Sequence, residues 1–320
     1  MKTKIVYVAT FGSGNYYLEQ TLLSACSVKM HSPHAETLLV TDDASAATLD
    51  GWHDTLYKYI DKVTTVCLPA DMDDMKRSRH LKTSLRTIVS GDYLFVDSDT
   101  IVCRPLDDID HVEGDVCAVA DMHGTFFGQP NDYAYAQFRK AGCQVTEYFT
   151  YYNSGVMLVR DTPKAHRLYA EWHARWLETC ERGMCKDQVA LRMADRQCGN
   201  VISEMCGEWN CQIFGRFLAY FKCAYILHYF SHCHRDSAKT MFLFRNDGIY
   251  SRMRAGRCIP DDVAERLRQP HKAFASHYMV LADEKYDAYL RLKPLLALDG
   301  YPRRLYLVRA FARLLSLFSL

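Results

Sequence analysis

The sequence predicts an α/β fold in which a sheet is flanked by helices and followed by a helical C-terminal region. Three observations lead to this prediction. Short apolar runs alternate with segments of helical spacing up to about residue 245, and the alternation then gives way to helical sequence. The chain has 320 residues, 49% of them hydrophobic, which is enough to bury a large core. We therefore expect two regions, residues 1–245 and residues 246–320.

The first three strands are expected near the N-terminus. Residues 4–10, KIVYVAT, form a short apolar run that stops before Gly12, and residues 16–30 have helical spacing. The runs TLLV at 37–40 and DKVTTVCL at 61–68 predict two further strands. Because these strands alternate with helices, the sheet is expected to be mostly parallel.

The fourth strand leads into a pair of acids. Residues 76–90, KRSRHLKTSLRTIVS, predict a basic amphipathic helix, and the apolar residues 93–96 predict a buried strand. Asp97 and Asp99 follow directly. Ligands of open α/β sheets gather at the carboxyl ends of strands, which is where these acids are expected.

Two more strands and a covering segment come next. Residues 115–121, DVCAVAD, and 154–160, SGVMLVR, predict strands, and the aromatic-rich stretch 126–152 between them is expected to cover the site. A helix is predicted over about residues 163–181.

Charge and cysteine content narrow the class of protein. A net charge of +1 from 39 basic and 38 acidic residues argues against binding nucleic acid by bulk electrostatics. Thirteen cysteines without a disulfide framework, and no signal peptide, predict reduced thiols in the cytoplasm. The spacing of the pairs Cys180/Cys185 and Cys206/Cys211 is compatible with zinc, or with cysteines that act as small buried hydrophobes.

The C-terminal segment, residues 303–320, is too short and too charged to span a bilayer. Arg309 and Arg313 share one helical face, while an apolar set can occupy another, a pattern typical of a helix at a membrane surface. The competing interpretation is a helix docked on the core or in a dimer contact. The apolar set is Val308, Phe311, Leu315 and Phe318.

Asp97 and Asp99 carry the clearest chemistry. Alternate side chains of an extended backbone share a side, so both carboxylates can turn toward one hard cation, Mn²⁺ or Mg²⁺. A cation that bridges two phosphates neutralises charge on a departing nucleoside diphosphate. An acid pair of this kind is also common as a solvated loop feature.

Four segments, in order along residues 4–235, resemble glycosyltransferase family 8. Residues 91–109, GDYLFVDSDTIVCRPLDDI, resemble the metal-binding strand of this family, and residues 6–28 resemble its first strand and helix. Residues 152–158 resemble its Asn-Ser-Gly motif and residues 186–188 its Asp-Gln motif. The resemblance implies a GT-A fold, the Rossmann-like nucleotide-diphospho-sugar transferase fold, with a mixed sheet. Residues 1–245 would then be the catalytic domain.

The resemblance also implies roles for single residues. His228 would be the third metal ligand beside Asp97 and Asp99, and neutral imidazole suits a manganese site. The alternative is a core histidine among aromatic neighbours. Lys82 or Arg79 would meet the diphosphate or the sugar, unless both lie on a solvated helix face. The donor and nucleotide contacts implied are Ala9, Thr10, Asp42, Lys82, Ser98, Asn153 and Ser154.

Three residues are expected at the transferred sugar. Asp121 and Asp187 would contact its hydroxyls together with Asn153, and Gln188 would lie nearest the anomeric carbon. The family retains the anomeric configuration of the donor. An amide at this position favours a front-face substitution in which the departing phosphate helps to deprotonate the acceptor. A covalent route through Asp121 or Asp187 stays open.

One segment departs from the family pattern. Ser231 and His234 stand where the family usually has a glycine and a phosphate-binding lysine, and Arg235 or Lys239 could replace that cation. A second interpretation of this segment is a soft-metal site for zinc. Its ligands would be His228, His232, Cys233 and His234.

The resemblance therefore predicts a metal-dependent hexosyltransferase that uses a UDP-sugar donor and a glycan or lipid-linked (glycolipid) acceptor. Synthesis of bacterial surface polysaccharide or lipopolysaccharide would explain the basic, apolar tail, and would place the protein in the cytoplasm, peripheral at the inner face of the membrane. Two rivals remain. A nucleotidyltransferase would need a longer glycine-rich loop than residues 11–15 provide. A non-catalytic nucleotide-sugar or glycan-binding protein of the same fold would carry the same motifs.

Overall fold

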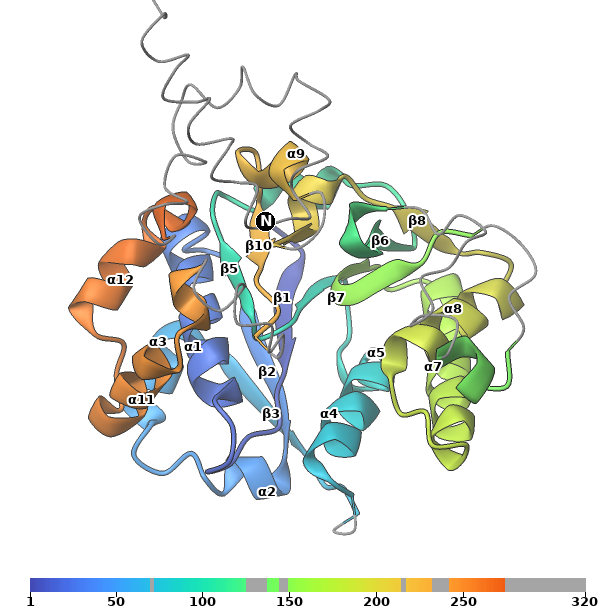
Figure 1. Cartoon of the computed structure of the whole chain (residues 1–320), viewed down its shortest axis with the longest axis horizontal. Helices are drawn as coiled ribbons and strands as arrows, with labels where there is room; N and C mark the ends of the chain where they lie inside the picture. Colours follow the sequence, from blue (N-terminus) through green and yellow to red (C-terminus); the bar gives the residue numbers. More distant parts are fainter. Residues whose placement is uncertain (70–71, 125–136, 144–148, 214–216, 232–241, 274–320) are drawn as a thin grey trace, which may run out of the picture.

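The computed structural model describes residues 1–273 except 70–71, 125–136, 144–148, 214–216 and 232–241 (Figure 1). β1 (Lys4–Val8) lies inside a seven-stranded sheet of order β3-β2-β1-β4-β7-β6-β8. The first four strands are parallel, β7 runs antiparallel to both of its neighbours, and β8 pairs in parallel with β6. The predicted mixed sheet flanked by helices is confirmed. The other strands are β2 (Thr37–Asp42), β3 (Lys62–Val66), β4 (Tyr93–Val96), β6 (Val116–Ala120), β7 (Tyr152–Val159) and β8 (Ile202–Glu204).

Helices cover both faces of this sheet (Figure 1). Successive side chains of a strand point to opposite faces, and in β1 Ile5 and Tyr7 pack into one core cluster while Val6 and Val8 pack into another. The Ile5 side is covered by α1 (Tyr17–His31), α3 (His53–Tyr59), α11 (Asp247–Gly256) and α12 (Asp261–Leu267). The Val6 side is covered by α4 (Asp74–Thr83), α5 (Leu85–Ile88), α7 (Pro163–Glu181) and α8 (Asp187–Gln197).

A second, three-stranded sheet has the order β5-β10-β9. β5 (Thr100–Val102) follows β4 after a short turn, and β10 (Ile226–His228) pairs with it in antiparallel fashion, so that His228 lies opposite Thr100. β9 (Cys211–Gln212) is parallel to β10. This sheet therefore carries a histidine from late in the chain to the end of β4. Further helices among the described residues are α2 (Asp43–Ala46), α9 (Leu218–Phe221) and the 3-10 turns η1 (Asp107–His111), η2 (Asp121–His123), η3 (Gly207–Asn210), η4 (Leu243–Arg245) and η5 (Pro270–Lys272).

The helices past residue 245 pack against α1. The Arg254 guanidinium donates to Glu19 at 2.6 Å, and the hydroxyls of Tyr16 and Ser251 are 2.8 Å apart. The boundary near 245 stays a prediction. The tail at 303–320 lies outside the described residues. Within the described ranges, no helix is both long and apolar enough to cross a membrane.

The helix predicted over 76–90 is two helices, α4 and α5. α4 begins earlier than predicted because the Asp73 side chain accepts a hydrogen bond from the Lys76 backbone N–H at 2.8 Å and caps the first turn. It ends at Thr83, where the hydroxyls of Thr83 and Ser84 donate to the carbonyls of Arg79 and His80, each four residues earlier. Such bonds compete with the helical ladder.

Two histidines between α4 and α7 should make stability depend on pH. The rings of His80 and His173 are 4.7 Å apart, burial lowers the pKa of both, and that of His173 is lowered further by His80. As pH falls through about 6.5, the unfolded chain gains protons that the folded pair resists, so stability is lost. We expect the melting temperature to fall between pH 7.5 and pH 5.5, and less so in His80→Phe. Identical pH profiles for both proteins would contradict this.

Candidate active site

The carboxyl ends of β1 and β4 meet at one point of the sheet. From β1 the chain continues through β2 and β3 on one side, and then returns to place β4 on the other side. Such a switch of direction opens a crevice beyond the strand ends, where ligands bind in α/β sheets. Ala9 and Thr10 follow β1, and Asp97 follows β4. The structure thus brings the expected nucleotide and metal residues to one edge.

Asp97, Asp99 and His228 form the only group of potential metal ligands among the described residues, with ligand atoms within 4.8 Å of one another. His228 Nε2 lies 3.2 Å from Asp99 Oδ1. The side chains of His228 and Asp99 are 3% and 12% exposed, whereas that of Asp97 is 27% exposed. Two carboxylates and one imidazole are a donor set that suits Mn²⁺ or Mg²⁺. These residues fit a divalent cation.

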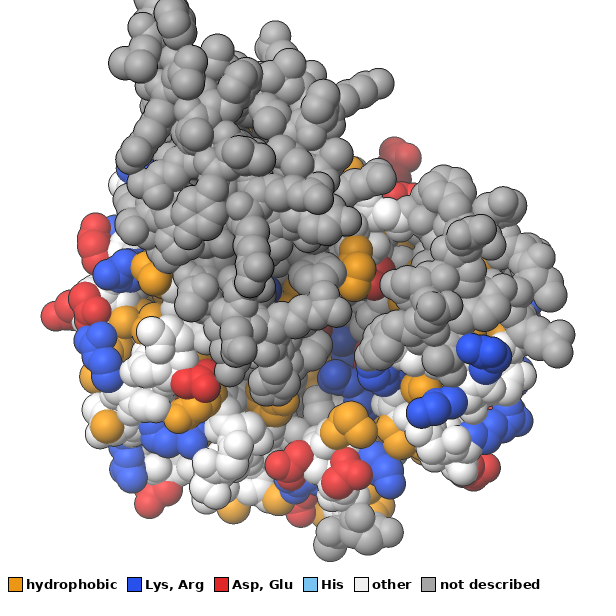
Figure 2. Space-filling view, in the orientation of Figure 1, with side chains coloured by type: hydrophobic (Ala, Val, Ile, Leu, Met, Phe, Trp, Pro, Cys, Tyr) orange, Lys and Arg blue, Asp and Glu red, His pale blue; other side chains and the backbone are white. Residues whose placement is uncertain are grey.

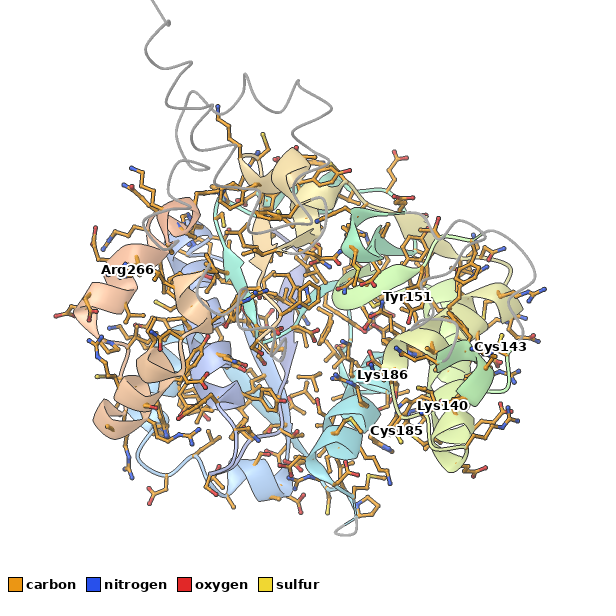
Figure 3. All side chains as sticks on the ribbon, viewed as in Figure 1. Lys140, Cys143, Tyr151, Cys185, Lys186 and Arg266 are labelled. Atoms are coloured by element: carbon orange, nitrogen blue, oxygen red, sulfur yellow. The ribbon has the colours of Figure 1, made fainter. Side chains whose placement is uncertain are left out.

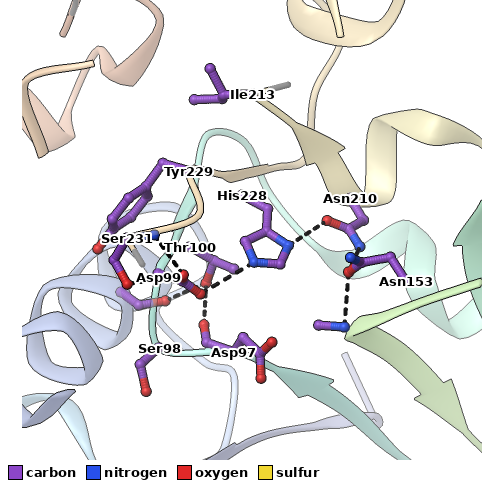
Figure 4. Close-up of polar contacts among 12 residues, drawn as sticks. Asp97, Ser98, Asp99, Thr100, Asn153, Asn210, Ile213, His228, Tyr229 and Ser231 are labelled. Atoms are coloured by element: carbon purple, nitrogen blue, oxygen red, sulfur yellow. Dashed lines mark hydrogen bonds and ion pairs between the residues drawn. The ribbon is translucent and has the colours of Figure 1, made fainter. Parts of the chain in front are cut away.

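The backbone around this group is held by hydrogen bonds (Figure 4). The Ser231 N–H and hydroxyl both donate to Asp99 Oδ2, at 2.9 and 3.1 Å. The Asp97 N–H donates to the Gly155 carbonyl at 2.7 Å, and the Thr100 hydroxyl donates to the Asp97 carbonyl at 2.8 Å. Ser231, which departs from the family glycine, thereby orients one of the acids.

A buried ionic network lies beside this group. Lys82, 3% exposed, places Nζ 3.1 Å from Asp97 Oδ1 and 3.4 Å from Asp187 Oδ2. Asp187 also pairs with Arg79 Nε at 2.9 Å and accepts from the Ser154 hydroxyl at 2.7 Å. Burial raises the pKa of Asp187, but the charges of Lys82 and Arg79 more than offset this and hold that pKa well below its usual range. Lys82 is therefore buried within the site and does not lie on a solvated helix face.

Lys82 and Arg79 of this network belong to α4, and Asp187 belongs to the first turn of α8. Figure 3 shows Cys185 and Lys186 leading into α8, and Figure 2 shows Lys and Arg side chains gathered in the region of α4. The indole N–H of Trp172 donates to the Asp187 carbonyl at 2.8 Å, and that of Trp176 donates to the Cys185 carbonyl at 3.0 Å. α7 thus fixes the first turn of α8, and with it the position of Asp187.

Asp121 and its partners form the neighbouring part of the site. The Asn153 amide donates to Asp121 Oδ1 at 2.9 Å, and Gln188 also forms a hydrogen bond with this carboxylate. Burial raises the pKa of Asp121, against the lowering effect of these two bonds. The expected sugar-side residues Asn153 and Gln188 therefore both contact Asp121.

The expected nucleotide contacts are farther along the same edge. Asp42 caps α2 by accepting from the Ser45 N–H at 2.9 Å, and its Oδ2 lies 2.9 Å from Arg77 Nη1 without an aligned hydrogen bond. The Thr10 hydroxyl donates to the Asp74 carbonyl at 3.1 Å. The hydroxyls of Ser98 and Thr21 are 2.8 Å apart, which turns Ser98 toward α1.

Two buried amides at this site were missed from the sequence. Asn210 lies between His228 and Asn153. Gln212 donates to the Ala120 carbonyl and accepts from the Met122 N–H at 2.7 Å, so it holds the turn that contains Asp121. The segment Trp209-Asn210-Cys211-Gln212 matches no motif, so nothing in its sequence marks either residue.

The zinc interpretation of the pairs Cys180/Cys185 and Cys206/Cys211 gains no support among the described residues. No disulfide joins two of the described cysteines, and none of them belongs to a metal-holding group within the described part of the chain. Cys180 and Cys185 are neighbours, and burial followed by the contact with Cys185 raises the pKa of Cys180 to about 12. His232, Cys233 and His234 lie outside the described residues, as do Arg235 and Lys239.

Gly155 leaves no room for a side chain. A Cβ there would lie 2.4 Å from His228 Cε1, 2.8 Å from Asp97 Oδ2 and 2.9 Å from Asn153 Oδ1. We expect Gly155→Ala to weaken Mn²⁺ binding and any cation-dependent reaction about 100-fold, because two presumed ligands must move. Calorimetric titration of Mn²⁺ checks this. Gly14→Ala, where a Cβ meets nothing within 4 Å, is the control; equal behaviour of the two variants would refute the prediction.

No family model and no curated protein matches this sequence. Among solved structures, the chain is similar to mouse xyloside xylosyltransferase 1 in its apo form, at 15% identity over 71% of this chain and 97% of that chain, with a TM-score of 0.47. It is also similar to the galactosyltransferase LgtC in complex with donor and acceptor sugar analogues, at 15% identity over 83% and 84% of the two chains, with a TM-score of 0.44. A third is the glycosyltransferase GlyE from Streptococcus pneumoniae, at 17% identity over 71% and 55%, with a TM-score of 0.43. At these scores, conclusions about function must come from the side chains of the site.

Proposed function

We propose that this protein is a metal-dependent, retaining glycosyltransferase that moves a hexose from a UDP-sugar to a glycan or lipid-linked acceptor. The observation that carries the proposal is the convergence of Asp97, Asp99 and His228 within 4.8 Å, beside Asp187. This combination suits an anionic donor whose diphosphate binds a cation and whose sugar meets carboxylates. The resemblance to glycosyltransferase family 8 gives the same assignment.

Each part of the site has a role in this proposal. A divalent cation held by Asp97, Asp99 and His228 would neutralise the charge that develops on UDP as it departs. Lys82 supplies a second positive charge next to Asp97, at 3.1 Å. The family resemblance places Asp42 at the base region of the nucleotide; in this structure its side chain is fully buried and its Oδ2 lies 2.9 Å from Arg77 Nη1.

Front-face substitution is favoured over a covalent route. Both oxygens of Asp187 are occupied, one by Arg79 and the other by Ser154 and Lys82, which makes this carboxylate a weak nucleophile. Asp121 is bound by Asn153 and by Gln188. Gln188 itself has an amide that can orient groups at the anomeric carbon but cannot form a stable covalent intermediate.

We also propose an acceptor class and a cellular location for this protein. A lipid-linked glycan, as in bacterial surface polysaccharide or lipopolysaccharide synthesis, would suit an enzyme whose tail at 303–320 docks from the cytoplasm on the inner face of the membrane. Liposome sedimentation with and without these residues tests the docking. Unchanged membrane binding after their deletion would refute it.

The proposed function is tested with a panel of UDP-sugars, with Mn²⁺ and with chelator, by measuring UDP release with and without acceptors. Release from one UDP-sugar that requires the cation is the expected result, and the anomeric configuration of the product reports retention. Tight binding of a UDP-sugar without any release would instead support the non-catalytic binding protein.

A further inference from the structure

Asn210 is a fully buried amide that contacts His228 on one side and Asn153, the partner of Asp121, on the other (Figure 4). It is the last residue of η3, directly before β9. The turn that carries it is firmly placed, because the rings of Trp209 and Tyr225 stack at 3.9 Å and the Tyr225 N–H donates to the Glu208 carbonyl at 2.8 Å. A buried amide in such a turn keeps one orientation.

The direction of every hydrogen bond around Asn210 follows from one backbone group. The Gly155 N–H can only donate, and it donates to Asn153 Oδ1 at 2.9 Å. Asn153 Oδ1 is therefore an acceptor, and its partner at 2.9 Å must be the Asn210 NH₂ group. The Asn153 NH₂ group then faces the Asp121 carboxylate, which can only accept while it is ionised.

The same reasoning places a proton on Nδ1 of His228. With its NH₂ group directed at Asn153, Asn210 turns its carbonyl oxygen toward His228 Nδ1, at 3.1 Å. An oxygen acceptor requires a proton on Nδ1, so in the neutral ring that a metal would bind, the lone pair is on Nε2. Nε2 is the atom that faces Asp99 Oδ1, at 3.2 Å.

We propose that Asn210 is the positioning residue of this metal site: it holds His228 in the tautomer that leaves Nε2 free to bind a cation together with Asp99. This inference rests on the proposed function. A neutral imidazole that binds a metal through one nitrogen usually donates its other N–H to an outer partner, and loss of that partner weakens metal binding about 10–100-fold. Through Asn153, the same amide also fixes the NH₂ group that Asp121 accepts from.

The inference is tested by Mn²⁺ binding, measured as the loss of the free-ion signal in electron paramagnetic resonance. Asn210→Leu removes the acceptor for Nδ1–H, and its Kd for Mn²⁺ should rise about 10–100-fold. Asn210→Asp keeps an oxygen acceptor for His228, so its Kd should stay within about threefold of the parent protein, while UDP release falls because a carboxylate cannot donate to Asn153.

Gln212→Leu is the matched control. Gln212 is also a fully buried amide, its Cα faces that of His228 across the β9–β10 pair, and its side chain bonds to Ala120 and Met122 and not to the imidazole. It should leave Mn²⁺ affinity unchanged, with circular dichroism confirming that all variants fold. Equal weakening by Asn210→Leu and Gln212→Leu would mean that loose packing, and not the tautomer, causes the effect, and would overturn the proposal.

Two further results separate this inference from the proposed function. Unchanged Mn²⁺ affinity in Asn210→Leu would overturn the role of Asn210 alone, since the metal site would still be intact. If Asn210→Leu does not fold, Asn210→Asp decides, because a Kd raised more than about tenfold in that variant contradicts the role of the oxygen acceptor. A parent protein that does not bind Mn²⁺ at all would remove the metal site, and with it the proposed function.

Discussion

Asp97→Ala should lower cation-dependent UDP release by about 10³-fold, the largest effect expected of any single substitution. The variant removes one ligand of the presumed cation and also deprives Lys82 of its 3.1 Å partner. Loss of charge stabilisation on a leaving diphosphate is worth several kcal/mol, and each 1.4 kcal/mol is about a factor of ten in rate. UDP release at saturating donor and Mn²⁺ is the measurement.

Asp54→Ala is the control for this experiment. The Asp54 side chain is fully exposed and has only the weak partner His53 at 3.7 Å, so its removal should change neither Mn²⁺ affinity nor rate. If Asp97→Ala released UDP at the parent rate while the chelator still inhibited the reaction, the cation would have to bind elsewhere, and the assignment of Asp97 would be wrong.

Asp187→Asn should lower both stability and activity. The substitution leaves Lys82 and Arg79 beside a neutral amide, and breaking a buried ion pair on one side costs about 3–5 kcal/mol. The pKa of Asp187 is depressed, so its contribution is present above the unfolded value of about 3.9 and is lost as pH falls toward the folded value. The two proteins should therefore differ in urea unfolding at pH 7, and the difference should shrink below about pH 4.

Asp195→Asn is the control that distinguishes an effect on stability from an effect on the reaction. Asp195 is 1% exposed on the same helix and pairs with Arg192 at 3.1 Å, outside the site. Its substitution should destabilise the fold without abolishing UDP release, whereas Asp187→Asn should reduce release about 100-fold even where the protein is folded. Equal activity of the two folded variants would exclude a direct role for Asp187.

The local sequence predicted those strands and helices whose apolar residues follow a clear periodic pattern. The run KIVYVAT is β1 because its β-branched and aromatic residues are buried on both faces, and Asp97 and Asp99 follow β4 as the strand pattern indicated. The helix break at Thr83 was not predicted, and the hydroxyl bonds of Thr83 and Ser84 that accompany it form only in the folded geometry. Hydroxyl bonding of this kind has no periodicity to detect.

Only those residues of the candidate site that belong to a sequence motif could be predicted. Residues expected from the family resemblance, among them His228 and Gln188, lie at the same edge of the sheet as Asp97 and Asp99. Asn210 and Gln212 were not predicted, because a buried amide acquires its role from partners far away in the chain, such as Asn153 and Ala120. The binding roles of all these residues remain proposals.

The small β5-β10-β9 sheet would make a cation bound at this site a reporter of long-range closure of the chain. Asp99 and its donor Ser231 are 132 residues apart, so the ligand set forms only after the long segment between them has closed into a loop. A cation that binds only this closed form adds RT ln(1 + [M]/Kd) to the free energy of unfolding, about 2.7 kcal/mol at a concentration of 100 Kd. Melting curves recorded across a series of divalent cations would then rank the metals without a donor, an acceptor or any turnover.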